Sequence, residues 1–140
     1  MQSILTVETS GPGLYEFTHA VQHAIAVAKV DTALCTLFCR HTSCSLLIQE
    51  NVDPDVRRDL DQFFQRLVPS ADDPSMAWLV HRSEGNDDMP AHIKAALTQV
   101  SLSIPVMDGK LALGIWQGIY VFEHRFRPHR REVVVHIAGD

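Results

Sequence analysis

The sequence predicts an α/β (α+β) fold, a single-domain sandwich of mainly antiparallel sheet with helices packed on it. Two observations predict this class. Apolar residues recur at helical spacing in several segments of the first two thirds, and the last third is built from apolar, strand-length segments separated by turn residues. A chain of 140 residues with 46% apolar side chains is long enough to form a hydrophobic core. We therefore expect one domain over residues 1–140.

The first fifty residues are expected to contain four strands and one helix. The strands are expected at residues 2–7, 14–17, 33–40 and 43–49. A helix is expected at residues 19–29, because its apolar residues recur on one face. These residues are Val21, Ala24, Ile25 and Ala28. His19 and His23 lie on the opposite face, so we expect both side chains to be exposed.

Two helices joined by a long polar loop are expected in the middle of the chain. Asp53 suits the N-cap of the first helix, Pro54 suits its first position, and Pro69 ends it. Its narrow apolar stripe consists of Val56, Leu60, Phe63, Phe64 and Leu67. The polar loop is expected at residues 70–88 and a short helix at residues 90–97. Long loops in compact domains often carry function, so this loop is of interest.

The last third of the chain is expected to be β-structure. Its strands are expected at residues 100–106, 111–122 and 132–137. Asp108-Gly109 is a hairpin turn signal between the first two of them. The long strand is apolar on both faces, so we expect Trp116 and Tyr120 to be buried. A strand of this kind needs a second layer or another subunit to cover it, which predicts a homo-oligomer.

Composition and charge exclude several classes of function. The 12 basic and 17 acidic side chains leave a net charge of −5, which argues against a nucleic-acid coat and against a membrane-surface protein. No signal peptide and no membrane-spanning segment is expected. The three cysteines, Cys35, Cys39 and Cys44, form no C-x-x-C pair, so we expect small core residues in a reduced, cytoplasmic protein.

Two polar clusters lie between the predicted strands and helices of the first two thirds. His41 and Ser43, followed by Glu50 and Asn51, form either part of a site or a polar strand edge ahead of a helix cap. The acidic residues at 84–88, followed by His92 and Lys94, form either a helix cap or a site for a hard cation such as Mg²⁺.

Two further clusters lie in the last third. Gln117 interrupts an aliphatic row, so its amide either bonds to the backbone or faces a ligand, and Gly118 permits close approach of another group. Residues 124–131 include four arginines and two histidines, a composition that suits either binding of phosphate oxygens or a solvated hairpin loop. Spacing alone indicates no metal site, because the histidines at 41, 92 and 124 are far apart in the sequence.

Three blocks of sequence resemble the successive signatures of the YjbQ family, whose members are often named secondary thiamine-phosphate synthases. They are HTSCSLLIQENVDPDVRRDL (residues 41–60), EGNDDMPAHIK (84–94) and GIWQGIYVFEHR (114–125). The resemblance covers essentially the whole chain and implies a compact α/β sandwich that assembles as a trimer. It also implies a site where the histidine blocks meet near the contacts between subunits.

The resemblance implies roles for particular residues. The implied catalytic residues are His41, Ser43, Glu50, Asn51, Asp88 and Gln117. The implied substrate- or phosphate-binding residues are Lys94, Arg130 and Arg131. The implied metal ligands are His41, His92 and His124. His124 departs from the family pattern, because many relatives have Asp there, and Cys44 stands where a small Ala is common.

Two functions follow as expectations. The first is thiamine-phosphate synthesis, in which an aminopyrimidine diphosphate joins a thiazole phosphate and releases pyrophosphate, with Mg²⁺ and cationic side chains neutralising the leaving group. The second is a trimeric metal-binding protein or metal-dependent hydrolase that holds Zn²⁺ or a similar ion through histidines. Both imply a divalent metal, Mg or Zn. The first implies a small phosphorylated metabolite as partner, and the second leaves the substrate open. A third reading is a non-catalytic ligand-binding or assembly protein.

Overall fold

The computed structural model describes residues 1–140 and has three α-helices and eight strands. The helices are α1 (Thr18–Ala28), α2 (Pro54–Leu67) and α3 (Asp88–Leu97), with a 3₁₀ turn at Pro74–Met76. The first four strands are β1 (Gln2–Thr9), β2 (Gly13–Glu16), β3 (Ala33–Cys39) and β4 (Cys44–Glu50). The last four are β5 (Ser101–Met107), β6 (Lys110–Leu111), β7 (Gln117–Glu123) and β8 (His129–Gly139).

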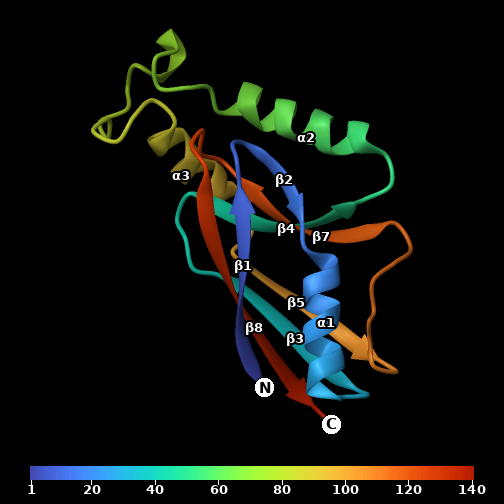
Figure 1. Ribbon diagram of the computed structural model, residues 1–140. Coiled ribbons are helices and arrows are strands. Elements are labelled where there is room, and N and C mark those ends of the chain that lie inside the picture. Colours follow the sequence, from blue (N-terminus) through green and yellow to red (C-terminus); the bar gives the residue numbers. More distant parts are fainter.

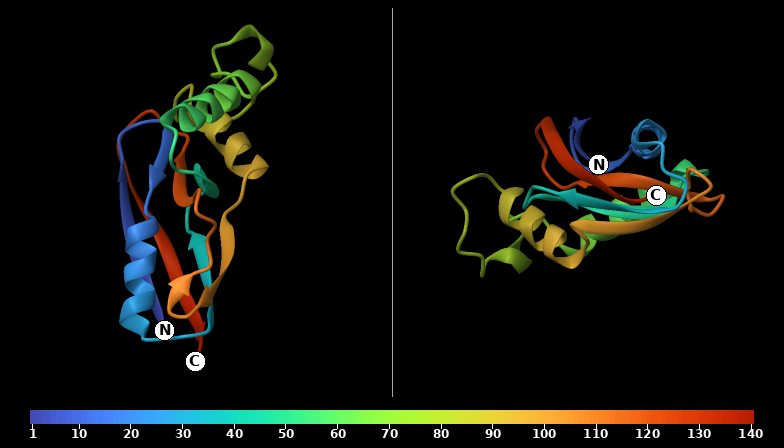
Figure 2. Two further views of the ribbon diagram at one scale, coloured as in Figure 1. Left: turned by 90° about the vertical axis from the view of Figure 1, so that its right-hand side faces the viewer. Right: turned by 90° about the horizontal axis from the view of Figure 1, so that it is seen from below.

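The strands form two antiparallel sheets that pack face to face. One sheet has five strands in the order β1-β8-β3-β5-β6, and the other has three in the order β2-β7-β4. A core cluster of 18 buried residues draws side chains from both sheets and from α1. Figure 1 shows α2 and α3 at the end of the molecule away from both termini, and Figure 2 shows the layers from two further sides. The predicted mixed α+β fold with mainly antiparallel sheets is confirmed.

Local signals in the sequence fix several of these elements. Asp108 and Gly109 have φ angles of 51° and 71°, and Met107 pairs with Lys110 across them, so the predicted two-residue hairpin is confirmed. The Asp53 side chain accepts a hydrogen bond from the Asp55 N–H at the start of α2, as expected of an N-cap. On α1, His19 and His23 are both exposed, as predicted.

The predicted long strand at residues 111–122 is broken in the structure. β6 ends at Leu111 and β7 begins at Gln117, where the Gln117 N–H closes a turn on the Gly114 carbonyl. The alternation of faces therefore does not continue through Trp116, which is 56% exposed, and the prediction that Trp116 is buried is wrong. Tyr120 is fully buried, as predicted.

β7 is buried on both faces. Ile119 and Val121 enter the main core, whereas Phe122 packs edge-on against Phe64 of α2 with ring centroids 5.1 Å apart. α2 itself contains no buried residue, and Phe63 and Leu67 on its apolar stripe are exposed. The helix therefore covers one face of β7 only partly.

The three cysteines are free and buried, which confirms their prediction as core residues. The Sγ atoms of Cys39 and Cys44 lie 3.4 Å apart, where β3 ends and β4 begins. None of the three helices is both long enough and apolar enough to cross a membrane.

Phe122→Ala should lower the free energy of unfolding by roughly 3–5 kcal/mol, because it leaves a cavity between β7 and α2. Trp116→Ala should cost less than about 1 kcal/mol, since that side chain is mostly in solvent. Urea unfolding of both variants measures the difference. Equal losses would contradict the turn at Gly114–Gln117.

Candidate metal centre

Three potential metal ligands converge beside the start of α3. His81, Asp88 and His92 each offer one ligand atom, and these atoms all lie within 4.8 Å of one another. Nε2 of His81 is 2.7 Å from Oδ2 of Asp88, and Nε2 of His92 is 3.3 Å from the same oxygen. Asp88 and His92 share a face of α3 at i, i+4 spacing, and the loop before the helix supplies His81.

Neighbouring groups orient the two ligands on α3. The carbonyl of Thr42 lies 2.8 Å from Nδ1 of His92. A carbonyl can only accept, so Nδ1 carries the proton and Nε2 is left to bind a metal. Arg125 donates from its Nη1 to Oδ1 of Asp88 at 2.8 Å, which turns Oδ2 toward the two imidazoles. Each of these ligands therefore has a fixed orientation before any ion binds.

The charge of Asp88 also suits metal binding. Its side chain is buried, and burial alone would raise the pKa of the carboxyl. The hydrogen bond with His81 and the positive charge of Arg125 outweigh burial and hold the pKa of Asp88 below its usual value. The carboxylate is therefore ionised at neutral pH. Two imidazoles and one carboxylate with an open side fit Zn²⁺ or another transition-metal ion better than Mg²⁺, which prefers oxygen ligands.

Arg125 ties this group to a second carboxylate. Its Nε donates to Oδ2 of Asp87 at 2.9 Å, and its Nη2 donates to the Glu84 carbonyl at 3.2 Å. Asp87 also accepts from the Phe126 N–H at 2.8 Å. Burial alone would raise the pKa of Asp87, but these donors lower it. One guanidinium thus holds two adjacent acidic residues at the helix start.

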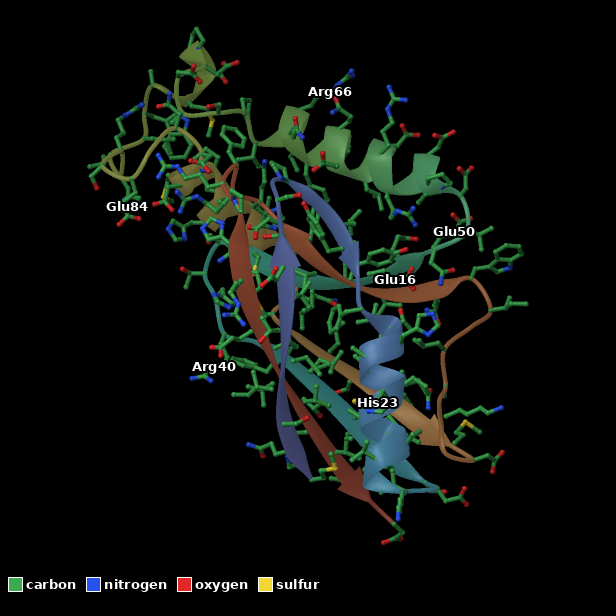
Figure 3. All side chains as sticks on the ribbon, in the orientation of Figure 1. Glu16, His23, Arg40, Glu50, Arg66 and Glu84 are labelled. Carbon is green, nitrogen blue, oxygen red and sulfur yellow. The ribbon has the colours of Figure 1, made fainter.

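The predicted site residues are divided between the two ends of the three-stranded sheet. Glu50 pairs with Gln117 at one end of β4 and β7, and Cys44 pairs with Glu123 at the other. Six residues of strand separate the two ends, which is about 20 Å. Figure 3 shows Glu50 and Glu84 on opposite sides of the molecule. Asp88, His92 and Lys94 lie on α3, with the Cys44 end.

The predicted site residues at the Glu50 end each bond to a neighbouring group of the protein. Asn51 donates to Oε2 of Glu16 at 3.2 Å, and Oε1 of Gln117 accepts from the Gly114 N–H at 2.7 Å. Glu50 accepts from the Asp53 N–H at 3.2 Å. A Cβ at Gly118 would lie 2.7 Å from Oε2 of Glu16, so the group that approaches this glycine closely is a side chain of the protein.

Arg131 and Ser43 belong to a buried network at the other end. Arg131 donates to both carboxylate oxygens of Glu123 and to the Ser43 hydroxyl at 3.0 Å. Thr9 also donates to Glu123 at 2.6 Å. Burial alone would raise the pKa of Glu123, but these donors lower it, so the pair stays charged. Arg130 is exposed and lies 3.4 Å from a Glu8 oxygen.

His41 and His124 lie outside the His81–Asp88–His92 group. Nε2 of His41 accepts from the Glu132 N–H at 2.7 Å, and Nε2 of His124 lies 3.1 Å from the Ser45 hydroxyl. Of the three histidines expected as ligands, only His92 belongs to the observed group. His81 was missed because it falls in the polar loop, and Arg125 because the arginine-rich segment looked like a solvated hairpin.

The fold and this group define the chain as a small α+β sandwich protein with a candidate two-histidine, one-carboxylate metal centre. The chain belongs to the YjbQ family, because the profile described as "UPF0047 protein YjbQ-like" matches residues 3–140. It is 50% identical to a UPF0047 protein of Synechocystis over 99% of this chain and 92% of that one. It is 36% identical to UPF0047 protein YjbQ of Escherichia coli O157:H7 over 99% and 98% of the two chains.

Solved structures agree with the fold. An uncharacterised YjbQ/UPF0047-family protein of Clostridium acetobutylicum superposes with a TM-score of 0.83 at 36% identity, covering 96% of this chain and 98% of that one. A hypothetical protein of Aeropyrum pernix K1 superposes with a TM-score of 0.88 at 23% identity, covering 100% and 99%, and shows the fold alone. None of these names states an activity.

His124→Gln should make the chain less sensitive to acid. Burial lowers the pKa of His124 to about 3, and the charge of Lys94 adds to the effect. Since unperturbed histidine titrates near about 6.5, the unfolded chain alone binds this proton between those values. Stability is therefore full above about pH 6.5 and falls toward pH 3, by up to about 1.4 kcal/mol per pH unit from this group.

Urea unfolding between pH 7 and pH 4 measures this effect. His124→Gln should reduce the acid slope relative to the wild type, and His23→Gln, an exposed control on α1, should leave it unchanged. Parallel slopes for all three proteins would show that His124 does not carry the effect.

Proposed function

We propose that this protein is a divalent-metal-dependent enzyme that hydrolyses a small phosphorylated molecule. One observation carries the proposal: His81, Asp88 and His92 converge, and His92 and Asp88 are each held in a metal-binding orientation by a neighbour. Hydrogen bonds that orient a side chain in this way accompany metal ligands, and a residue that only caps a helix does not need them.

The residues take separate roles in this proposal. His81, Asp88 and His92 hold the cation, which when bound would acidify a water molecule and polarise a phosphoryl oxygen. Arg125 keeps Asp88 ionised and aimed. Arg127 is exposed and forms no ion pair. It lines, with Arg125, a hollow of about 440 Å³ beside the group, where its guanidinium is available to a phosphate.

A second candidate is thiamine-phosphate synthase activity. The observation in its favour is the same hollow, in which the acidic residues Glu84 and Asp87 lie beside Arg125 and Arg127. Oxygen ligands next to cationic side chains suit Mg²⁺ and a diphosphate leaving group. The hydrolytic proposal is preferred, because Oδ2 of Asp87 already accepts from Arg125 and from the Phe126 N–H, and because the imidazoles favour a transition metal.

His81→Ala and His92→Ala should each lose most of the bound metal, because two ligands hold a cation far less tightly than three. Purified variants are analysed by inductively coupled plasma mass spectrometry. His41→Ala is the matched control, and it should retain metal, since Nε2 of His41 is bonded to β8. Metal lost from His41→Ala and retained by His81→Ala would favour the His41–His92–His124 set instead.

Activity separates the two candidates. Chelation should abolish hydrolysis of p-nitrophenyl phosphate, and Zn²⁺ or another transition-metal ion should restore it more than Mg²⁺ does. The synthase reaction is assayed in parallel with aminopyrimidine diphosphate and thiazole phosphate. Synthase activity that needs only Mg²⁺ and survives His92→Ala would reject the hydrolytic proposal.

We also propose that the chain forms a homo-oligomer, with a trimer expected. The support is α2, which has no buried residue and exposes Phe63 and Leu67 along one stripe. Light scattering should therefore give a mass near three times that of the 15.7 kDa chain. Phe63→Glu should dissociate the assembly, and His19→Glu on α1 should not. A monomer at micromolar concentration would contradict the proposal.

A further inference from the structure

A second hollow lies on another face of α3, between that helix, the end of α2 and the segment after β7. Its volume is about 100 Å³, enough for a group of a few atoms. Lys94, His124, Gln65, Ser70 and Asp87 line it. His81 and His92 do not, so the hollow is separate from the metal group.

Lys94 is the unusual residue of this hollow. Its side chain is only 6% exposed, yet its ammonium forms no hydrogen bond and has no carboxylate within 4.0 Å. Every side-chain nitrogen or oxygen that is shut off from solvent in this protein has a partner. The ammonium must therefore open onto the hollow. Burial of an unpaired charge is costly, so an incoming ligand is the natural partner.

His124 adds a second open polar atom. The residue is 2% exposed and its Nε2 is 3.1 Å from the Ser45 hydroxyl, but its Nδ1 has no partner within the protein. By the same reasoning Nδ1 also opens onto the hollow. The negative charges of Asp61 and Asp87 act on Lys94 from a distance, but neither carboxylate lies within 4.0 Å of its ammonium. Arg125 and the Phe126 N–H already bind Oδ2 of Asp87.

The remaining lining favours phosphate over a carboxylate. Ser70 donates its hydroxyl proton to the Asn86 carbonyl at 3.3 Å, so its oxygen can only accept from a ligand. Oε1 of Gln65 is a second acceptor, and the amide nitrogen, which donates one proton to Asp61 at 2.7 Å, keeps a second proton. A monohydrogen phosphate has both anionic oxygens and a hydroxyl that donates, whereas a carboxylate has no donor.

We propose that this hollow binds a phosphate group, with Lys94 Nζ as the principal contact and His124 Nδ1 as the second. The choice of phosphate rests on the proposed function, but the hollow and its unpaired ammonium do not depend on the metal. Arg125 links the two places, because it binds Asp87 of the hollow and Asp88 of the metal group. A phosphorylated molecule held at Lys94 would thus lie next to the metal centre.

The test is a calorimetric titration of chelator-treated, metal-free full-length protein with inorganic phosphate. The wild type should show saturable binding, and Lys94→Met should weaken it by about tenfold or more, since a charge-assisted hydrogen bond is lost. Lys110→Met removes the same charge from an exposed site and should leave the affinity unchanged. Absence of saturable binding, or equal affinity in the two variants, would overturn the proposal.

Two further measurements make the result unambiguous. Lys94→Met should melt at the same temperature as the wild type or higher, because Lys94 has no partner to lose. A lower melting temperature with unchanged phosphate binding would show a structural role, such as pairing with another copy of the chain. Acetate should not displace phosphate, and displacement at similar concentrations would assign the hollow to a carboxylate. Since the protein is metal-free throughout, failure of the metal proposal does not affect these outcomes.

Discussion

The buried ion pair between Glu123 and Arg131 connects the two sheets at the end of the sandwich that carries the candidate metal centre. Glu123 ends β7 in one sheet and Arg131 lies in β8 of the other. Breaking a buried pair of this kind leaves an uncompensated charge and typically costs about 3–5 kcal/mol. The same carboxylate accepts the backbone N–H groups of His124 and Arg125 at 3.0 and 3.1 Å. It therefore sets the direction in which the chain leaves β7 and delivers the Arg125 side chain to α3.

The geometry of the metal group follows from that turn. Arg125 lies 38 residues after Asp87 and 37 after Asp88 in the sequence, and its side chain bonds to both. Its bond to Asp88 turns that carboxylate toward His81 and His92. Thr42, in the connection between β3 and β4, orients the His92 ring from 50 residues away. The three candidate ligands come from residues 81–92, and the two groups that orient them come from two other segments, the β3–β4 connection and the chain after β7. The spacing of the ligands alone therefore does not show how they are oriented.

Features that depend on a few adjacent residues could be predicted from the sequence, whereas those that depend on contacts between distant residues could not. The hairpin at Asp108-Gly109 and the cap at Asp53 depend on a few adjacent residues, so both were predictable. α3 was expected to begin at Pro90, but it begins at Asp88, and that shift of one half-turn places Asp88 on the same face as His92. A helix predicted to begin at Asp88 would have placed Asp88 and His92 at i, i+4 spacing. His81 requires the path of the whole loop, which periodicity does not encode.

The residues that resemble family signatures differ in how much bonding capacity the fold leaves them. Glu50, Asn51 and Gln117 each bond to a neighbouring backbone or side-chain group at one end of the sheet. Lys94 and Arg127 retain unused cationic groups at the other end, beside α3. A natural sequence breaks rules of packing and pairing chiefly where function requires it. The buried Lys94 without a partner and the oriented side chains of Asp88 and His92 lie on α3, and Arg127, which forms no ion pair, lies in the segment after β7.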